Sequence, residues 1–140
     1  MTDKPSGFSL KVALTSLVVL VIVLVAGYFA YDYYYTAKYA AVLNETIEEA
    51  VLESAPSGTF KGAYSYGDFA YEVEVTIESN RIESIKILNN RTSWHARRAE
   101  AIVDRVLAKG NVNVDTVSGA TVTSKALLKA IELAIPLGDC

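Results

Sequence analysis

The chain has 140 residues, and its 16 acidic residues outnumber its 13 Lys and Arg, which leaves a formal charge of -3 at pH 7. A chain with this balance lacks the basic footprint of a nucleic-acid-binding protein, so we expect no nucleic acid among its partners. The single cysteine, Cys140, excludes a disulfide framework and a thiolate metal site within the chain.

The first element that the sequence predicts is a membrane-spanning helix over Val12 to Tyr31, a run without any charged residue. At about 1.5 Å per residue, a helix of this length crosses a hydrocarbon core of about 30 Å. A cluster typical of the interfacial aromatic belt closes the run: Tyr28, Tyr31, Tyr33, Tyr34 and Tyr35. The alternative is a cleaved signal peptide, whose apolar region is usually shorter and ends in a small-residue cleavage site that Ala26-Gly27-Tyr28 does not match.

The flanking charges predict how this helix is oriented. Lys4 and Lys11 precede the span, whereas Asp32 and only Lys38 follow it closely. Because positively charged flanks stay inside, residues 1–11 are expected in the cytoplasm and the rest of the chain outside. We therefore expect a single-pass protein of the cell membrane that contacts lipid through residues 12–31.

Residues 32–57 are predicted to form a stalk helix and a linker. Apolar residues recur at helical spacing from Tyr39 onward: Ala40, Leu43, Ile47, Ala50 and Val51. Pro56 and Gly58 then interrupt the pattern. The stalk would continue out of the membrane toward a separate outer domain.

Residues 58–140 are expected to form that domain, which begins with strands. The segment FKGAYSYGDF, from Phe60 to Phe69, suits a strand and a turn. Tyr71 to Glu78 alternates strictly between apolar and polar residues, as a half-buried antiparallel strand does. A short turn leads to a third strand over Ile82 to Ile87.

Helices follow the strands. Apolar residues at helical spacing predict one helix from Ala96 to Leu107, which Gly110 would close, and a last helix from Val122 to Ile135. Strands followed by helices indicate an α+β fold, in which a small antiparallel sheet has helices packed on one face.

The stretch VDTVSGATVTSKALLKAI, residues 114–131, concentrates hydroxyl residues at the start of the last helix. Ser118 is a candidate N-cap, and the unpaired N–H groups of a helix start form a ready site for a phosphate. Gly119 would let a ligand approach the backbone, Thr121 offers a hydroxyl in the first turn, and Lys125 could neutralise an anion. From the residues alone, a plain capped helix is the alternative.

Asp115-Thr116-Val117-Ser118-Gly119-Ala120-Thr121 resembles the flavinylation motif D-x-x-[ST]-G-A-T of the FMN-binding domain family. That domain occurs in the C subunit of the sodium-pumping NADH:quinone reductase, in the G subunit of the Rnf complex and in small membrane-anchored relatives. The order of Tyr66-Gly67, the strand after it and the helix from Ala96 also resembles the family, over about Gly58 to Ile135.

The resemblance implies that FMN is attached through its phosphate to the last threonine of the motif, which is Thr121. A separate flavin transferase would make this bond from FAD with a divalent metal, and Asp115, Ser118, Gly119 and Ala120 would form the binding loop. Thr123 is a second hydroxyl outside the core motif, and no metal is expected to stay bound to this chain.

Larger members of the family carry a Glu-Thr-Pro-Gly-like loop where this chain has Thr92-Ser93-Trp94-His95-Ala96. Trp94 would either stack on the flavin or cover the core. His95 would either hydrogen-bond the flavin or be solvated.

Together these features predict a membrane-anchored extracytoplasmic flavoprotein. It would carry electrons between a membrane reductase, or the subunits of a redox complex, and an outer acceptor. The alternative is a non-flavinylated binding or assembly subunit of such a complex. A stand-alone enzyme is less expected, because the sequence shows no acid–base pair of a substrate pocket.

Overall fold

The computed structural model describes residues 9–49 and 52–136 of the chain. Two compact units make up the chain, residues 1–37 and residues 38–140. Lys4, Cys140 and positions 50 and 51 of the expected stalk lie outside the described residues.

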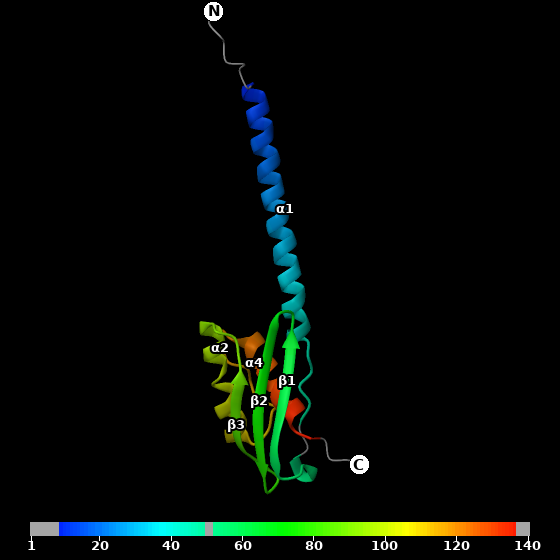
Figure 1. Ribbon diagram of the computed structural model, residues 1–140, viewed down its shortest axis with the longest axis vertical. Coiled ribbons are helices and arrows are strands. Elements are labelled where there is room, and N and C mark those ends of the chain that lie inside the picture. The colour runs from blue at the N-terminus through cyan, green and yellow to red at the C-terminus, as the bar shows by residue number, and fades with distance from the viewer. Residues whose placement is uncertain (1–8, 50–51, 137–140) are drawn as a thin grey trace, which may run out of the picture. The chain divides into compact units, whose positions relative to one another are not determined.

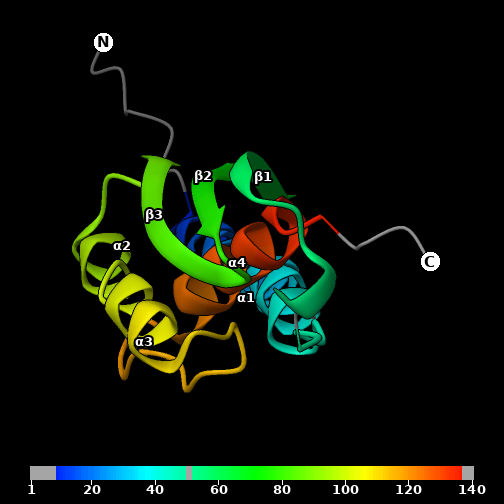
Figure 2. The ribbon, with the colours of Figure 1, turned by 90° about the horizontal axis from the view of Figure 1, so that it is seen from below.

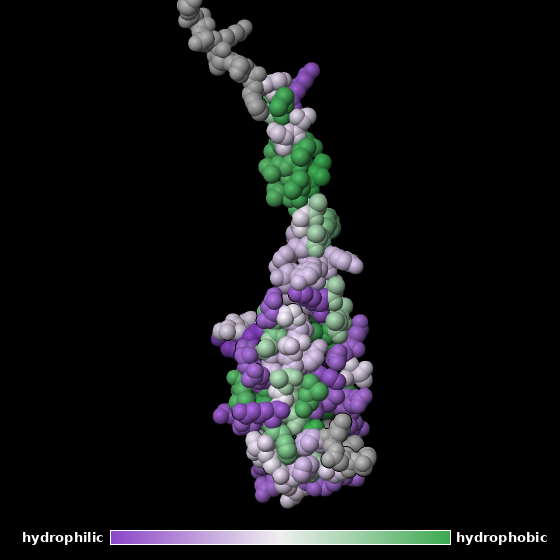
Figure 3. Space-filling model, turned by 45° about the vertical axis from the view of Figure 1, so that its right-hand side comes forward, coloured by the Kyte–Doolittle hydropathy of each residue, from purple (hydrophilic) through white to green (hydrophobic). Residues whose placement is uncertain are grey.

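Helix α1 runs from Leu10 to Leu43 and contains the whole predicted span. Its mean hydropathy over the most apolar window is 2.7, so the helix is long and apolar enough to cross a membrane. In the first unit its apolar side chains are exposed on every face, with Leu24 63% exposed. Figure 3 shows these residues as one hydrophobic band along the helix. A band that is apolar all round is what contact with lipid requires.

The second unit contains a three-stranded antiparallel sheet in the order β1-β2-β3, as Figure 1 shows. The strands are β1 (Gly58–Tyr66), β2 (Phe69–Glu78) and β3 (Arg81–Asn89). The predicted alternation is confirmed, because Tyr71, Val73, Val75 and Ile77 are buried on one face of β2. Ser79 and Asn80 both have positive φ angles, of 51° and 61°, as a two-residue hairpin turn requires.

Three helices lie on one face of this sheet: α2 (Trp94–Ala99), α3 (Ile102–Lys109) and α4 (Thr121–Ala134). Figure 2 shows α4 against the middle of the sheet, with α2 and α3 on the side of β3. The α+β fold is therefore as expected. The single helix expected from Ala96 to Leu107 is wrong, since it is interrupted at Glu100, where tighter i→i+3 hydrogen bonds replace the helical ones.

Helix α4 packs directly on β1 at Gly62. A Cβ atom at this position would lie 2.0 Å from the carbonyl oxygen of Ala130 and 2.6 Å from the backbone nitrogen of Ala134. The backbones of the strand and the helix are therefore in contact, with no room for a side chain between them. Around this point Leu127 and Ile131 are fully buried in the core.

The expected stalk helix ends earlier than predicted. Helix α1 stops at Leu43, residues 44–49 are not helical, and a short 3-10 helix covers Leu52–Ser54. We call residues 44–49 the strap. The apolar spacing beyond Leu43 thus did not produce a helix, because side chains of α4 bind the backbone groups that a helix would pair internally.

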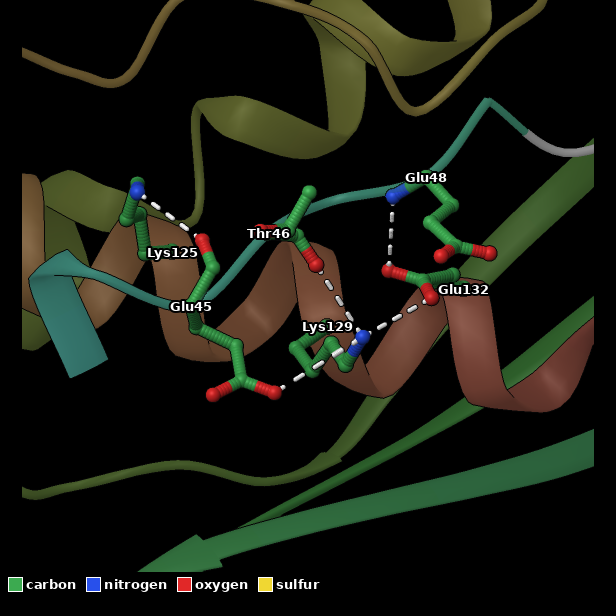
Figure 4. Close-up of polar contacts among 6 residues, drawn as sticks. All are labelled: Glu45, Thr46, Glu48, Lys125, Lys129 and Glu132. Atoms are coloured by element: carbon green, nitrogen blue, oxygen red, sulfur yellow. Dashed lines mark hydrogen bonds and ion pairs between the residues drawn. The ribbon is translucent and has the colours of Figure 1, made fainter. Parts of the chain in front are cut away.

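Three side chains on one face of α4 make these contacts, as Figure 4 shows. Lys125 Nζ donates to the carbonyl oxygens of Leu43, at 2.5 Å, and Glu45, at 3.1 Å. Lys129 Nζ donates to the carbonyl of Thr46 at 3.1 Å and pairs with two carboxylates, those of Glu45 and Glu132. Glu132 in turn accepts from the backbone N–H of Glu48 at 3.3 Å. The strap is therefore held by charged groups of the helix.

We expect Gly62→Ala to lower the free energy of unfolding of the second unit by about 3 kcal/mol, the upper end for overpacking, because backbone atoms cannot give way. Ala63→Val is the control, since Ala63 is exposed on the same strand. Urea denaturation in detergent micelles, followed by circular dichroism, measures both. Equal midpoints for the two variants would contradict the contact.

We expect the double variant Lys125→Met and Lys129→Met to speed hydrogen exchange in the strap by roughly tenfold or more, since hydrogen bonds to charged groups are worth about 1.5–3 kcal/mol. Lys61→Met, on the exposed side of β1, is the control. Exchange of peptides covering residues 44–49 is read by mass spectrometry. Unchanged exchange would show that the lysines do not hold the strap.

Candidate functional site

A cavity of about 270 Å³ opens at the start of α4. Three parts of the second unit form its walls: the end of α1, the loop between β3 and α2, and the loop that leads into α4. The residues lining it are Tyr39, Arg91, Ser93, His95, Gly119, Ala120, Thr121, Val122 and Thr123.

The start of α4 carries no side-chain cap. Its N-cap residue is Ala120, so the expectation that Ser118 caps the helix is wrong. Gly119 adopts a left-handed conformation, with φ at 77°, and this turn leaves Ser118 exposed and two residues short of the cap position. The N–H groups of a first helical turn have no partner within their helix. Thr121, Val122 and Thr123 therefore present donors at the wall of the cavity.

The loop before α4 is fixed from within. The buried hydroxyl of Ser124 accepts a hydrogen bond from the backbone N–H of Val117 at 3.2 Å. Arg105 of α3 donates to the carbonyl oxygens of Asp115, at 2.8 Å, and Thr116, at 3.0 Å. The loop is thus held by both the helix that follows it and the helix that precedes it.

The structure brings together only some of the predicted site residues. Gly119, Ala120, Thr121 and Thr123 line the cavity. Thr121 is exposed, whereas Thr123 is only 4% exposed. The others lie elsewhere and do not line it: Asp115 and Ser118 earlier in the loop, Lys125 at the strap, and Trp94 on the surface.

His95 contacts the motif directly. Its Nδ1 lies 2.9 Å from the carbonyl oxygen of Gly119. Because a carbonyl only accepts, Nδ1 carries the hydrogen. His95 is exposed at the cavity and hydrogen-bonded at the same time, so it joins the loop before α2 to the glycine turn. Trp94 is 58% exposed and does not cover the core. It packs edge-on to His95 and lies under the guanidinium of Arg98.

Hydrogen bonds hold the loop between β3 and α2, in which sequence reasoning considered Trp94 and His95 but missed Ser93 and Arg91. Ser93 caps α2 by accepting from the N–H of Ala96 at 3.1 Å, a role that a serine before a helix could have indicated. The side chain of Asn90 accepts from the N–H of Arg91 at 2.8 Å and donates to the carbonyl of Ala96 at 3.1 Å. These bonds fix Arg91 in the cavity wall.

Aromatic residues support Arg91. Its guanidinium carbon lies 3.6 Å from the centroid of the Phe69 ring. The rings of Tyr66 and Tyr71 stack at 5.7 Å, and their hydroxyls are 3.2 Å apart. Burial, together with the hydrogen bond to Tyr71, raises the pKa of Tyr66 well above its ordinary value, so this phenol is uncharged at neutral pH. Tyr39, from the cavity wall, packs edge-on to Tyr66.

The model of the FMN-binding domain family matches residues 66–136. This region, about half of the chain, contains β2, β3, α2, α3 and α4. It includes each residue of the cavity wall except Tyr39. None of the curated proteins is significantly similar to this chain. A match over half of the chain, which includes two of the strands and nearly all of the cavity wall, shows that the chain belongs to the FMN-binding domain family.

Proposed function

We propose that this protein is a membrane-anchored electron carrier that holds FMN covalently through a phosphoester on Thr121. The observation that carries the proposal is the exposed hydroxyl of Thr121 at an uncapped helix start, inside a cavity of an FMN-binding domain. Thr123 is buried and therefore less open to a modifying enzyme.

The surroundings of Thr121 fit a phosphate. In the attachment reaction the oxygen of Thr121 would attack the FMN phosphorus of FAD, AMP would leave, and the hydroxyl proton would pass to a base of the transferase. The remaining negative charge of the diester would meet the N–H groups of the first turn of α4, where the helix dipole stabilises an anion. Gly119, in the left-handed turn with φ at 77°, has no side chain of its own beside this position.

The size of the cavity supports electron exchange at the surface. Pockets that enclose a drug-sized ligand have about 300–1,000 Å³, and this cavity has about 270 Å³. Part of FMN would then remain outside the wall, within reach of a partner protein. When bound, FMN supplies one- and two-electron redox chemistry, while the protein supplies position and charge.

The membrane and the partners complete the proposal. Helix α1 would span the membrane, with Lys4 and Lys11 on the cytoplasmic side and the FMN-binding domain outside. A cofactor that is bound without a covalent link can dissociate outside the cell and be lost by diffusion. A covalent link prevents this loss. Electrons would come from a membrane reductase or the subunits of a redox complex and pass to an outer acceptor.

We expect the wild-type chain, co-expressed with a flavin transferase, to gain the mass of FMN less one water, and Thr121→Val to gain nothing. Thr123→Val is the matched control and should be modified normally. Intact mass and fluorescence of the denatured band under ultraviolet light measure the adduct. An unmodified wild type beside an active transferase would contradict the covalent link and favour an assembly subunit.

We expect Gly119→Ala to slow flavinylation, because an L-residue in the left-handed region costs about 1–2 kcal/mol and shifts the loop before Thr121. Gly110→Ala is the matched control. Gly110 has a similar φ of 70°, and at both glycines an added Cβ would have no atom within 4 Å beyond the glycine and its two chain neighbours. Both variants should lose similar stability, but only Gly119→Ala should lower the initial rate of flavin incorporation. Equal rates would show that the turn does not present Thr121.

A further inference from the structure

Arg91 is a half-buried cation that has no counter-charge within the part of the chain that the structure describes. The ion pairs found among the described residues join Lys129 to Glu45 and Glu132. No carboxylate of the described residues pairs with Arg91. A charge withdrawn from water is costly unless it is paired. The fold retains this guanidinium in the wall of the cofactor cavity, which indicates that the missing anion comes from a ligand.

The contacts of Arg91 hold its position but do not cancel its charge. Phe69 offers the face of its ring at 3.6 Å. The hydroxyls of Tyr66 and Tyr71 also interact with the guanidinium, and they are neutral groups. Asn90 fixes the backbone beneath it through the N–H of Arg91. A cation held in this way is preorganised to bind an anion.

FMN carries negative charge on its phosphate and, when reduced, on its ring, and different groups of the cavity would face the two. The N–H groups at the start of α4 already face the position of the phosphate on Thr121. Lys125, the nearest lysine of α4, donates to the strap and not to the cavity. The ring of FMN becomes an anion when it has taken up two electrons and one proton, and its negative charge then lies at the N1–C2 edge. A fixed positive charge near this edge tunes the cofactor.

We propose that Arg91 binds the negatively charged edge of the FMN ring in its reduced state and raises the midpoint potential of the cofactor. The inference depends on the proposed function in taking FMN as the ligand, but it does not depend on the covalent bond. Arg91 is in this role a positioning and tuning residue of the cavity wall.

The test compares midpoint potentials of the full-length protein in detergent micelles, titrated with dithionite against a reference dye. We expect Arg91→Gln to shift the potential to more negative values and Arg91→Lys to recover part of the shift. Arg97→Gln is the control, since Arg97 is exposed on α2 and does not line the cavity. A potential unchanged in Arg91→Gln, or shifted equally in Arg97→Gln, would overturn the proposal. Unfolding midpoints of all variants identify a loss of fold.

A second arm separates the ring from the phosphate and from the covalent link. In the Thr121→Val background, free FMN and riboflavin are titrated into the protein under reducing conditions. We expect Arg91→Gln to weaken both ligands by the same factor, because both carry the ring. Loss of FMN affinity alone would assign Arg91 to the phosphate and overturn the proposal. If the covalent link fails to form, this arm still tests the role of Arg91. A chain that binds neither FMN nor riboflavin would overturn both proposals.

Discussion

The site depends on the contact between the backbone of β1 and that of α4 at Gly62. Because position 62 carries no side chain, the two backbones approach to contact distance, and this contact sets how closely α4 lies on the sheet. The start of α4 is therefore placed by the core, several turns away from the cavity that it lines. Under the proposed function, a hydroxyl that a transferase must reach and a cofactor that exchanges electrons at a fixed place would both need such a support.

Charges around α4 are used in two separate ways. Its first turn leaves N–H groups open toward the cavity, whereas Lys125 and Lys129 on a later face pair with backbone carbonyls and carboxylates of the strap. Arg91 supplies the cavity with a positive charge from another element, the loop before α2. This separation follows from helix geometry. Lys125 and Lys129 are four residues apart and share one side of α4, whereas the unpaired N–H groups lie at its first turn.

The features that depend on local sequence patterns could be predicted from the sequence. The alternation along β2, the apolar face of α4 and the glycine that ends α3 were all recognisable, as was the motif around Thr121. Features decided by distant contacts were not. The strap replaced a predicted helix because α4 side chains bind its backbone. One local feature was missed as well, since the left-handed turn at Gly119 leaves Ala120 and not Ser118 at the cap position. The bond from His95 to Gly119 and the stacking of Arg91 on Phe69 join residues too far apart in the chain for any spacing rule.

The strap has a mechanical consequence. It directly follows the end of α1 within the second unit, and its lysine and glutamate partners lie on α4, the helix that begins with Thr121. A pull on the end of α1 would therefore reach α4 through the strap, and would reach the sheet through the packing of Tyr39 on Tyr66. Release of the strap from α4 would lengthen the free connection after α1 by up to about 3.3 Å per released residue. Under the proposed function, Lys125 and Lys129 would therefore limit how far the cofactor can move.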